Sequence, residues 1–205
     1  MTDRHPLAFL SYVRSDDEHD GGRISTFRER LEGEVRMHRG RAFPIFQDRN
    51  DIAWGQHWES RIRQSISDVT FFIPIVTPSF FRSPACRHEF EAFLLKETTL
   101  GVNRLILPVY YLTSEQMSND YPVGLDSIAD VIRGRQWTDW RRFRFKPHSD
   151  EGVAEALSLL AETIRESIDE LESIIKIANQ KSGQGRFEAA IEKQSIDSKI
   201  IQVTS

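Results

Sequence analysis

The chain has 205 residues, 39% hydrophobic and 28% charged, a size that suits one domain with a hydrophobic core plus a tail. Its net charge of −4 argues against a protein built to bind polyanions, and its single cysteine excludes an internal disulfide. The longest apolar run, residues 69–76, is too short to span a bilayer, and residues 1–12 lack the apolar run of a signal peptide, so we expect a cytoplasmic protein without a membrane partner.

Short apolar runs alternate with amphipathic segments in the first half of the chain. Residues 7–12 are typical of a buried parallel strand, and they precede a predicted helix with apolar residues at helical spacing: Ile24, Phe27, Leu31 and Val35. A second strand is predicted at 43–46, followed by a polar loop and a helix with one apolar stripe, Trp58, Ile62 and Ile66. The third strand, 69–76, is apolar throughout, as expected for a strand covered on both faces. Pro74 removes a ladder donor from this strand, so we expect a bulge or bend there.

The same alternation continues in the second half. A helix is predicted to begin at Ser83, a favourable N-cap, with Pro84 as its first residue. Strands are predicted at 104–111 and 131–137, and a long helix follows with one apolar face: Ala154, Leu157, Leu160, Ala161, Ile164, Ile168, Leu171 and Ile175. This order predicts an α/β fold with a parallel sheet between two helical layers, in which ligands bind outside the carboxyl ends of the strands. Residues 1–175 are expected to form this domain, and 176–205 a linker or C-terminal tail that could lead to a further module.

Familiar catalytic and cofactor motifs are absent from the sequence. It contains no G-x-G-x-x-G or P-loop, no H-E-x-x-H or paired C-x-x-C, and no G-x-S-x-G. We therefore expect neither a metal nor a resident cofactor.

The segment SPACRHEF, residues 83–90, combines a thiol, an imidazole and a carboxylate. On a helical wheel Cys86 and Phe90 face the sheet, and Glu89 lies at the border of that side, about 80° from its middle. Glu89 is either a boundary residue that stabilises the helix N-terminus or a functional carboxylate. A catalytic dyad of Cys86 and His88 is disfavoured, because side chains two residues apart on a helix point in different directions. Cys86 is better explained as a small buried hydrophobic residue.

Three segments together resemble the signature regions of the Toll/interleukin-1 receptor (TIR) domain. They are FLSYVRSDD after the first strand, FQDRNDIAWGQHWESRIRQSISD after the second, and VTPSFFRSPACRHEF after the third. The S-x-x-C-x-x-E of Ser83, Cys86 and Glu89 is the most specific part and is similar to TIR domains that cleave NAD+. The resemblance covers roughly residues 7–175 and implies a flavodoxin-like three-layer sandwich with a five-stranded parallel sheet. It is imperfect, because Val13 replaces a common basic residue.

The resemblance implies roles for individual residues. Glu89 matches the catalytic glutamate of the family, and Tyr12 and Arg14 match a segment whose arginine lines the nucleotide site. Residues 48–55 match the BB-loop, which gates the site and packs against neighbouring copies. The substrate-binding residues implied are Tyr12, Arg14, Asp48, Trp54, Trp58, Ser83 and Cys86. The assembly residues implied are Asp51, Ile52, Trp54 and Gly55.

The activity implied is cleavage of the nicotinamide–ribose bond of NAD+ by assembled copies, in bacterial anti-phage immune defence. The product would be ADP-ribose, a cyclic ADP-ribose or a base-exchanged dinucleotide. NAD+ would be the substrate, and the partners would be other TIR copies in a homo-oligomer or filament, or a sensor or effector module. The alternative is a non-catalytic TIR scaffold that signals through homotypic TIR–TIR contacts, and Glu89 discriminates the two because such adaptors generally lack it.

Two further interpretations are weaker. One is a flavodoxin-like binding module for FMN or a response-regulator partner. The acidic residues Asp16, Asp17 and Glu18 would suggest a phosphoacceptor site, but no lysine follows the fourth strand. The segment 133–146 has six basic residues, one acidic residue and interleaved aromatic residues, so it carries +5 and the rest of the chain −9. Such a segment could bind single-stranded nucleic acid, but a basic face that docks on an acidic face of another copy, or a solvated loop, is the favoured interpretation.

Overall fold

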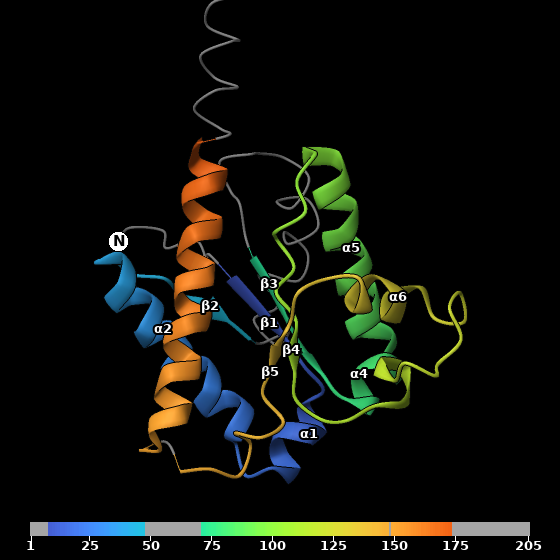
Figure 1. Ribbon diagram of the computed structural model, residues 1–205, viewed down its shortest axis with the longest axis horizontal. Helices are drawn as coiled ribbons and strands as arrows, with labels where there is room; N and C mark the ends of the chain where they lie inside the picture. Colours follow the sequence, from blue (N-terminus) through green and yellow to red (C-terminus); the bar gives the residue numbers. More distant parts are fainter. Residues whose placement is uncertain (1–7, 48–70, 148, 174–205) are drawn as a thin grey trace, which may run out of the picture. The chain divides into compact units, whose positions relative to one another are not determined.

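The computed structural model describes residues 8–47, 71–147 and 149–173 (Figure 1). The chain divides into two units, residues 1–167 and 168–205, and the second is described only over the helical residues 168–173. No helix in the described ranges is both long enough and apolar enough to cross a membrane.

Five parallel strands form one sheet in the order β2-β1-β3-β4-β5. The strands are β1 (Ala8–Ser11), β2 (Ile45–Phe46), β3 (Phe71–Val76), β4 (Val109–Tyr110) and β5 (Thr138–Asp139). This order confirms the predicted flavodoxin-like fold. Because the order reverses between β1 and β3, their carboxyl ends flank the switch point where doubly wound folds bind ligands.

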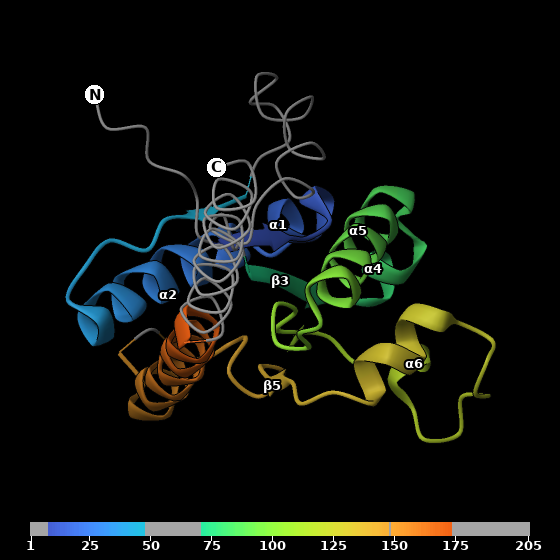
Figure 2. The same cartoon turned by 90° about the horizontal axis from the view of Figure 1, so that it is seen from above.

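Helices cover both faces of the sheet. They are α1 (Arg14–His19), α2 (Arg23–Arg39), α4 (Pro78–Arg82), α5 (Pro84–Leu100), the 3-10 turn η2 (Glu115–Met117) and α6 (Ser127–Arg133). A last helix begins at residue 151. Figure 2 shows α4 and α5 on one side of β3 and α2 on the other.

The alternation of side chains along the central strands explains this layering. Phe9, Phe72 and Val76 enter the hydrophobic cluster under α5, where the rings of Phe72 and Phe93 stack at 4.6 Å. The intervening residues on β1 and β3 supply the opposite face, and all of them are buried: Ala8, Leu10, Phe71, Ile73 and Ile75. The predicted apolar stripe of α2 is buried as well: Ile24, Phe27, Leu31 and Val35.

Pro74 does not produce the predicted bulge. Before Pro74, Phe72 bridges Ile106, and after it Ile75 pairs with Val109. The register between the two strands is therefore the same on both sides of the proline. No residue is therefore inserted. The N–H and C=O of Phe72 both form hydrogen bonds on the side of β3 that faces β4. Pro74 is two residues later and faces the same side, so its missing N–H removes one hydrogen bond from the ladder between β3 and β4.

The prediction of a strand at 131–137 is wrong, because α6 extends to Arg133 and β5 begins at Thr138. The carboxylate of Asp126 caps α6 by accepting from the N–H of Ile128 at 3.0 Å and from the next N–H at 3.2 Å. Ile128 and Ile132, four residues apart, are both buried. This cap and spacing outweigh the preference of the β-branched residues for strands.

The last helix differs from its predicted face at one position. Val153 is buried and Ala154 is exposed, whereas four other predicted residues of the first unit are buried: Leu157, Leu160, Ala161 and Ile164. The predicted helix with Trp58, Ile62 and Ile66, and the predicted face residue Ile175, lie outside the described residues.

Candidate functional site

A buried carboxylate lies at the carboxyl edge of the sheet, beside the switch point. Glu89 stands on the second turn of α5, which follows β3 through the short helix α4. Its Oε2 accepts a hydrogen bond of 2.6 Å from Oγ of Ser11, the last residue of β1. The residue Glu89 is 9% exposed and Ser11 is 1% exposed. The carboxylate therefore lies against the sheet and not in bulk solvent.

Two hydroxyl caps fix the helices that carry this carboxylate. Oγ of Ser83 accepts from the N–H of Cys86 at 3.3 Å, and Pro84 occupies the first turn of α5, which confirms the predicted helix start. Oγ1 of Thr77 accepts from the N–H of Phe80 at 3.1 Å and caps α4 in the same way. The turn after β3 is thus set by local hydrogen bonds, and it delivers the second turn of α5 to the end of β1.

Cys86 is fully buried in the hydrophobic cluster under α5, which confirms the small buried hydrophobe that the wheel predicts. A thiol enclosed in apolar surroundings is inert, so it is not a nucleophile. The direct substrate contact that the resemblance implies for Cys86 has no support from this burial. His88 and Glu91, on the same helix, are exposed.

The residues after β1 lie at the same edge of the sheet. Tyr12 is half-buried, and Arg14 is the exposed first residue of α1. Nε of Arg14 donates to Oε1 of Glu18 at 3.0 Å, with side-chain exposures of 74% and 66%. An exposed pair of this kind contributes at most about 1 kcal/mol, so the guanidinium can leave it to bind an anion.

The rest of the predicted site cannot be placed. Six of its residues lie outside the described residues: Asp48, Asp51, Ile52, Trp54, Gly55 and Trp58.

The acidic residues of α1 serve the fold. Oγ1 of Thr77 donates to Oδ2 of Asp16 at 2.7 Å, which ties α1 to the end of β3. Asp17 accepts from the N–H of Ile24 at 2.8 Å and from the hydroxyl of Ser25 at 2.5 Å, which ties α1 to α2. These contacts use the carboxylates as helix anchors, so a phosphoacceptor role has no support here.

The sequence interpretation missed Ser11. Its signal is weak but physical: on β1 the side chains of Phe9 and Ser11 share a face, so a hydroxyl stands where the strand pattern calls for an apolar group. Its partner is 78 residues away in the chain, and sequence spacing does not indicate such a pair.

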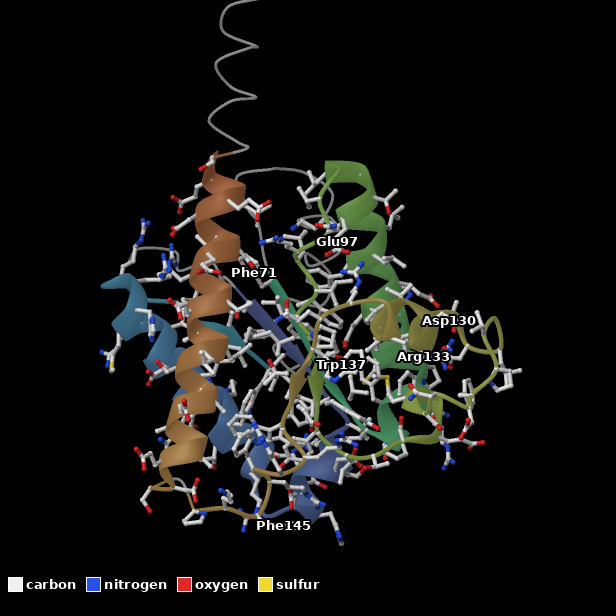
Figure 3. The ribbon with its side chains drawn as sticks, in the orientation of Figure 1. Phe71, Glu97, Asp130, Arg133, Trp137 and Phe145 are labelled. Carbon is white, nitrogen blue, oxygen red and sulfur yellow. The ribbon has the colours of Figure 1, made fainter. Side chains whose placement is uncertain are left out.

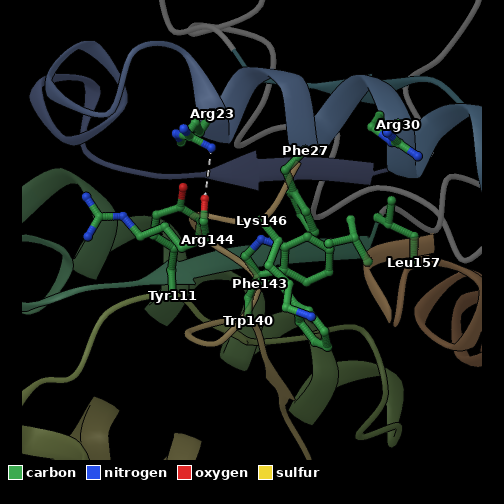
Figure 4. A pocket seen from close by; sticks show the side chains of 10 residues that line it. Arg23, Phe27, Arg30, Tyr111, Trp140, Phe143, Arg144, Lys146 and Leu157 are labelled. Carbon is green, nitrogen blue, oxygen red and sulfur yellow. Dashed lines mark hydrogen bonds between the residues drawn. The ribbon is translucent and has the colours of Figure 1, made fainter. Parts of the chain in front are cut away.

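A small cavity lies between α2, the segment 140–146 and the last helix (Figure 4). Its volume of about 10 Å³ is room for a single water molecule, so it does not hold a nucleotide. A wider groove beside α2, about 480 Å³, has two carboxylates in its lining of Glu29, Glu32, Gly33, Arg36, Ala42 and Phe43. Those carboxylates disfavour a pyrophosphate there.

An ion network borders the small cavity. Nε and Nη2 of Arg144 each donate to the carboxylate of Asp20 at 3.0 Å, and the hydroxyl of Tyr111 donates to it at 2.5 Å. Arg23 adds a hydrogen bond to the carbonyl of Arg144, drawn as a dashed line in Figure 4. Burial, the hydrogen bond and the charge of Asp20 all hold the pKa of Tyr111 well above its usual range, so its proton stays in place. This network fastens the segment 140–146 to the turn between α1 and α2.

Asp20 makes the stability of the fold dependent on acid. Burial alone would raise the pKa of Asp20, but hydrogen bonds from Arg144 and Tyr111 outweigh it and hold the pKa below the ordinary 3.8. Such a group stabilises the fold above its unfolded pKa, about pH 4, and the contribution is lost as pH falls through the folded pKa. We expect urea unfolding to show wild type more stable than Asp20→Asn at pH 7, with the difference shrinking below about pH 4. The exposed Asp120→Asn is the control, and an Asp20→Asn difference that persists undiminished to about pH 2 would contradict the assignment.

Most cations of the segment 133–146 are paired within the chain. Five of its six basic side chains contact carboxylates, some of them labelled in Figure 3: Arg133–Asp130, Arg135–Glu97, Arg141–Asp139, Arg144–Asp20 and Lys146–Asp150. Trp140 and Phe143 are buried, whereas Phe145 is 71% exposed. The pairs of Arg135 and Arg144 are largely buried, and two of the aromatic rings are not available for base stacking, so this segment gives no support to nucleic-acid binding.

The described part of the chain contains no group of three or more His, Cys, Asp and Glu side chains that could hold a metal ion. A comparison with curated proteins finds no match. A family model described as TIR domain matches residues 9–157, a segment that contains both Ser11 and Glu89. Because that match covers well over half of the 205 residues, and the sheet has the order expected for this fold, the chain belongs to the TIR-domain family.

Proposed function

We propose that the protein cleaves the nicotinamide–ribose bond of NAD+, with Glu89 as the catalytic carboxylate. A TIR domain is compatible with homotypic signalling or with NAD+ cleavage. The observation that favours cleavage is the carboxylate of Glu89, buried at the switch point and bonded to Ser11 at 2.6 Å. In a scaffold this buried carboxylate would only satisfy the hydroxyl of Ser11, whereas cleavage would use its charge, whose burial costs free energy.

One carboxylate is sufficient for this reaction. Most glycosidases need two, because an acid must protonate the leaving oxygen. Nicotinamide is a cationic pyridinium in NAD+ and departs neutral, so no proton has to be supplied. What remains is positive charge that develops on the ribose, and an oriented carboxylate shielded from water stabilises it electrostatically.

The residues around Glu89 would hold the rest of the dinucleotide. Arg14, exposed at the same edge and paired only weakly with Glu18, is suited to the pyrophosphate. Tyr12, half-buried after β1, is suited to stack on a ring. Whether water, a ribose hydroxyl or another base attacks next decides between ADP-ribose, a cyclic ADP-ribose and base exchange.

Nicotinamide release from NAD+ tests the proposal. The full chain is assayed over a range of protein concentrations and with a crowding agent, beside Glu89→Gln, and the products are separated by chromatography. Turnover that depends on Glu89 supports the proposal. An assembled protein without turnover would overturn it and favour the homotypic scaffold.

We further propose that activity requires assembly through the loop 48–55, in a bacterial defence that responds to phage. Self-association is common among TIR domains, and the resemblance assigns this loop to the contact between copies. We expect Trp54→Ala to weaken self-association in sedimentation velocity and to lower turnover with it, while turnover at saturating protein concentration recovers. An unchanged sedimentation profile would count against this loop as the contact.

A further inference from the structure

The hydroxyl of Ser11 occupies a place that the strand pattern assigns to an apolar side chain. Phe9, two residues earlier on the same face of β1, belongs to the hydrophobic cluster under α5. Ser11 is 1% exposed, so its hydroxyl has lost its water and needs a protein partner. That partner is Oε2 of Glu89.

The hydroxyl of Ser11 and the carboxylate of Glu89 are carried by two separately anchored elements, β1 and α5. β1 lies between β2 and β3, and Ser11 itself is in register with Pro74 of β3. On the other side, the cap of Ser83 fixes the start of α5. The donor and the helix that carries the acceptor are thus held independently, one by the sheet and one by the cap.

The carboxylate of a glutamate needs such a donor if its orientation is to be defined. The last torsion of a glutamate side chain is broad and has no sharp rotamer. A hydrogen bond of 2.6 Å from a hydroxyl to a carboxylate is in the range of a strong, charge-assisted bond. A bond of this kind from the end of β1 restricts the plane of the carboxylate.

We propose that Ser11 is a positioning residue of the active site: its hydroxyl orients the Glu89 carboxylate toward the substrate ribose. This inference rests on the function proposed above. Ser11 acts only through Glu89. The competing explanation is that Glu89 simply satisfies a buried hydroxyl, in which case the pair matters for stability and not for turnover.

The test measures kcat and KM for NAD+ in the full-length wild type and in Ser11→Ala, Ser11→Thr, Glu89→Gln and the Ser11→Ala/Glu89→Gln double variant. Ser11→Ala is expected to lower kcat about tenfold and to change KM less than about twofold. Ser11→Thr keeps the donor and recovers most of kcat. In the Glu89→Gln background, removing the hydroxyl has no further effect. Ser167→Ala, which deletes another buried hydroxyl bonded to the carbonyl of Thr163, leaves kcat unchanged.

A second measurement does not depend on turnover. The carboxylate stretch of Glu89, identified in the infrared difference spectrum between wild type and Glu89→Gln, is expected to shift in Ser11→Ala and to stay in place in Ser167→Ala.

The outcomes separate the inference from the function beneath it. If wild type turns over NAD+, Glu89→Gln lowers kcat by at least about 100-fold, and Ser11→Ala matches wild type in kcat, the positioning role is overturned and the proposed function stands. A drop in kcat that persists in the Glu89→Gln background also overturns it, because Ser11 would then act elsewhere. If wild type releases no nicotinamide when assembled, the proposed function fails and the positioning role fails with it.

Discussion

Glu89→Gln is expected to lower kcat for NAD+ cleavage by at least about 100-fold, the scale of loss when one preorganised electrostatic group at the reacting centre is removed. Glutamine keeps the size of the side chain and can still accept the hydrogen bond from Ser11, so the loss isolates the negative charge. The 9% exposure of Glu89 adds to the effect, because a charge away from water interacts more strongly with the ribosyl cation.

Glu91→Gln is the matched control for this variant. Glu91 stands two residues further along α5 and is exposed, so we expect its kcat to stay within about twofold of wild type. Both are measured by nicotinamide release at a protein concentration that gives full assembly. Equal rates for Glu89→Gln and wild type would move catalysis to another residue.

Glu97→Ala is expected to lower the free energy of unfolding by about 3 to 5 kcal/mol, the range for breaking a buried ion pair. Glu97 is 2% exposed near the end of α5 (Figure 3), and Arg135 donates to both of its oxygens, at 3.0 and 2.6 Å. Its Oε1 also accepts from the N–H of Leu105 at 2.8 Å and of Ile106 at 3.1 Å. Removing the carboxylate leaves two backbone donors without this acceptor, and a largely buried guanidinium without a counter-charge, bonded only weakly to the carbonyl of Asn103 at 3.3 Å.

Urea unfolding measures this loss, with Glu91→Ala on the exposed side of the same helix as the reference. The reference is expected to change stability by less than about 0.5 kcal/mol. A loss below about 1 kcal/mol for Glu97→Ala would place its pair with Arg135 among ordinary surface ion pairs.

The alternation of strands and helices could be predicted because burial imposes simple periods on the sequence. The stripe of α2 repeats every three to four residues, and β3 is apolar at every position because both of its faces are covered. The capped start of α5 at Ser83 is a local signal and was predicted to the residue. These features depend on neighbours in the chain.

The features that were mispredicted or missed depend on distant neighbours. β4 and β5 have two residues each, so they are defined by pairing with their neighbours and not by their composition. The first residues of the segment 131–137, predicted as a strand, form the end of α6. Ser11 and Glu89 are 78 residues apart, and Asp20 and Arg144 are 124 apart. A helical wheel places Glu89 at a boundary, but only the fold shows which hydroxyl meets it there.

The missing hydrogen bond at Pro74 has a consequence for the chain before it folds. FFIPIV, the sequence of β3, is uncharged and rich in β-forming residues, and a hexamer of that kind readily stacks into intermolecular cross-β structure. A proline inside it interrupts any continuous backbone ladder, in a stray aggregate as much as in the native sheet. The native sheet tolerates the lost bond because β3 is enclosed by strands and helices on all sides, whereas an aggregate would meet the gap in every layer. We therefore expect Pro74 to limit the self-association of this uncharged, apolar stretch before the chain folds.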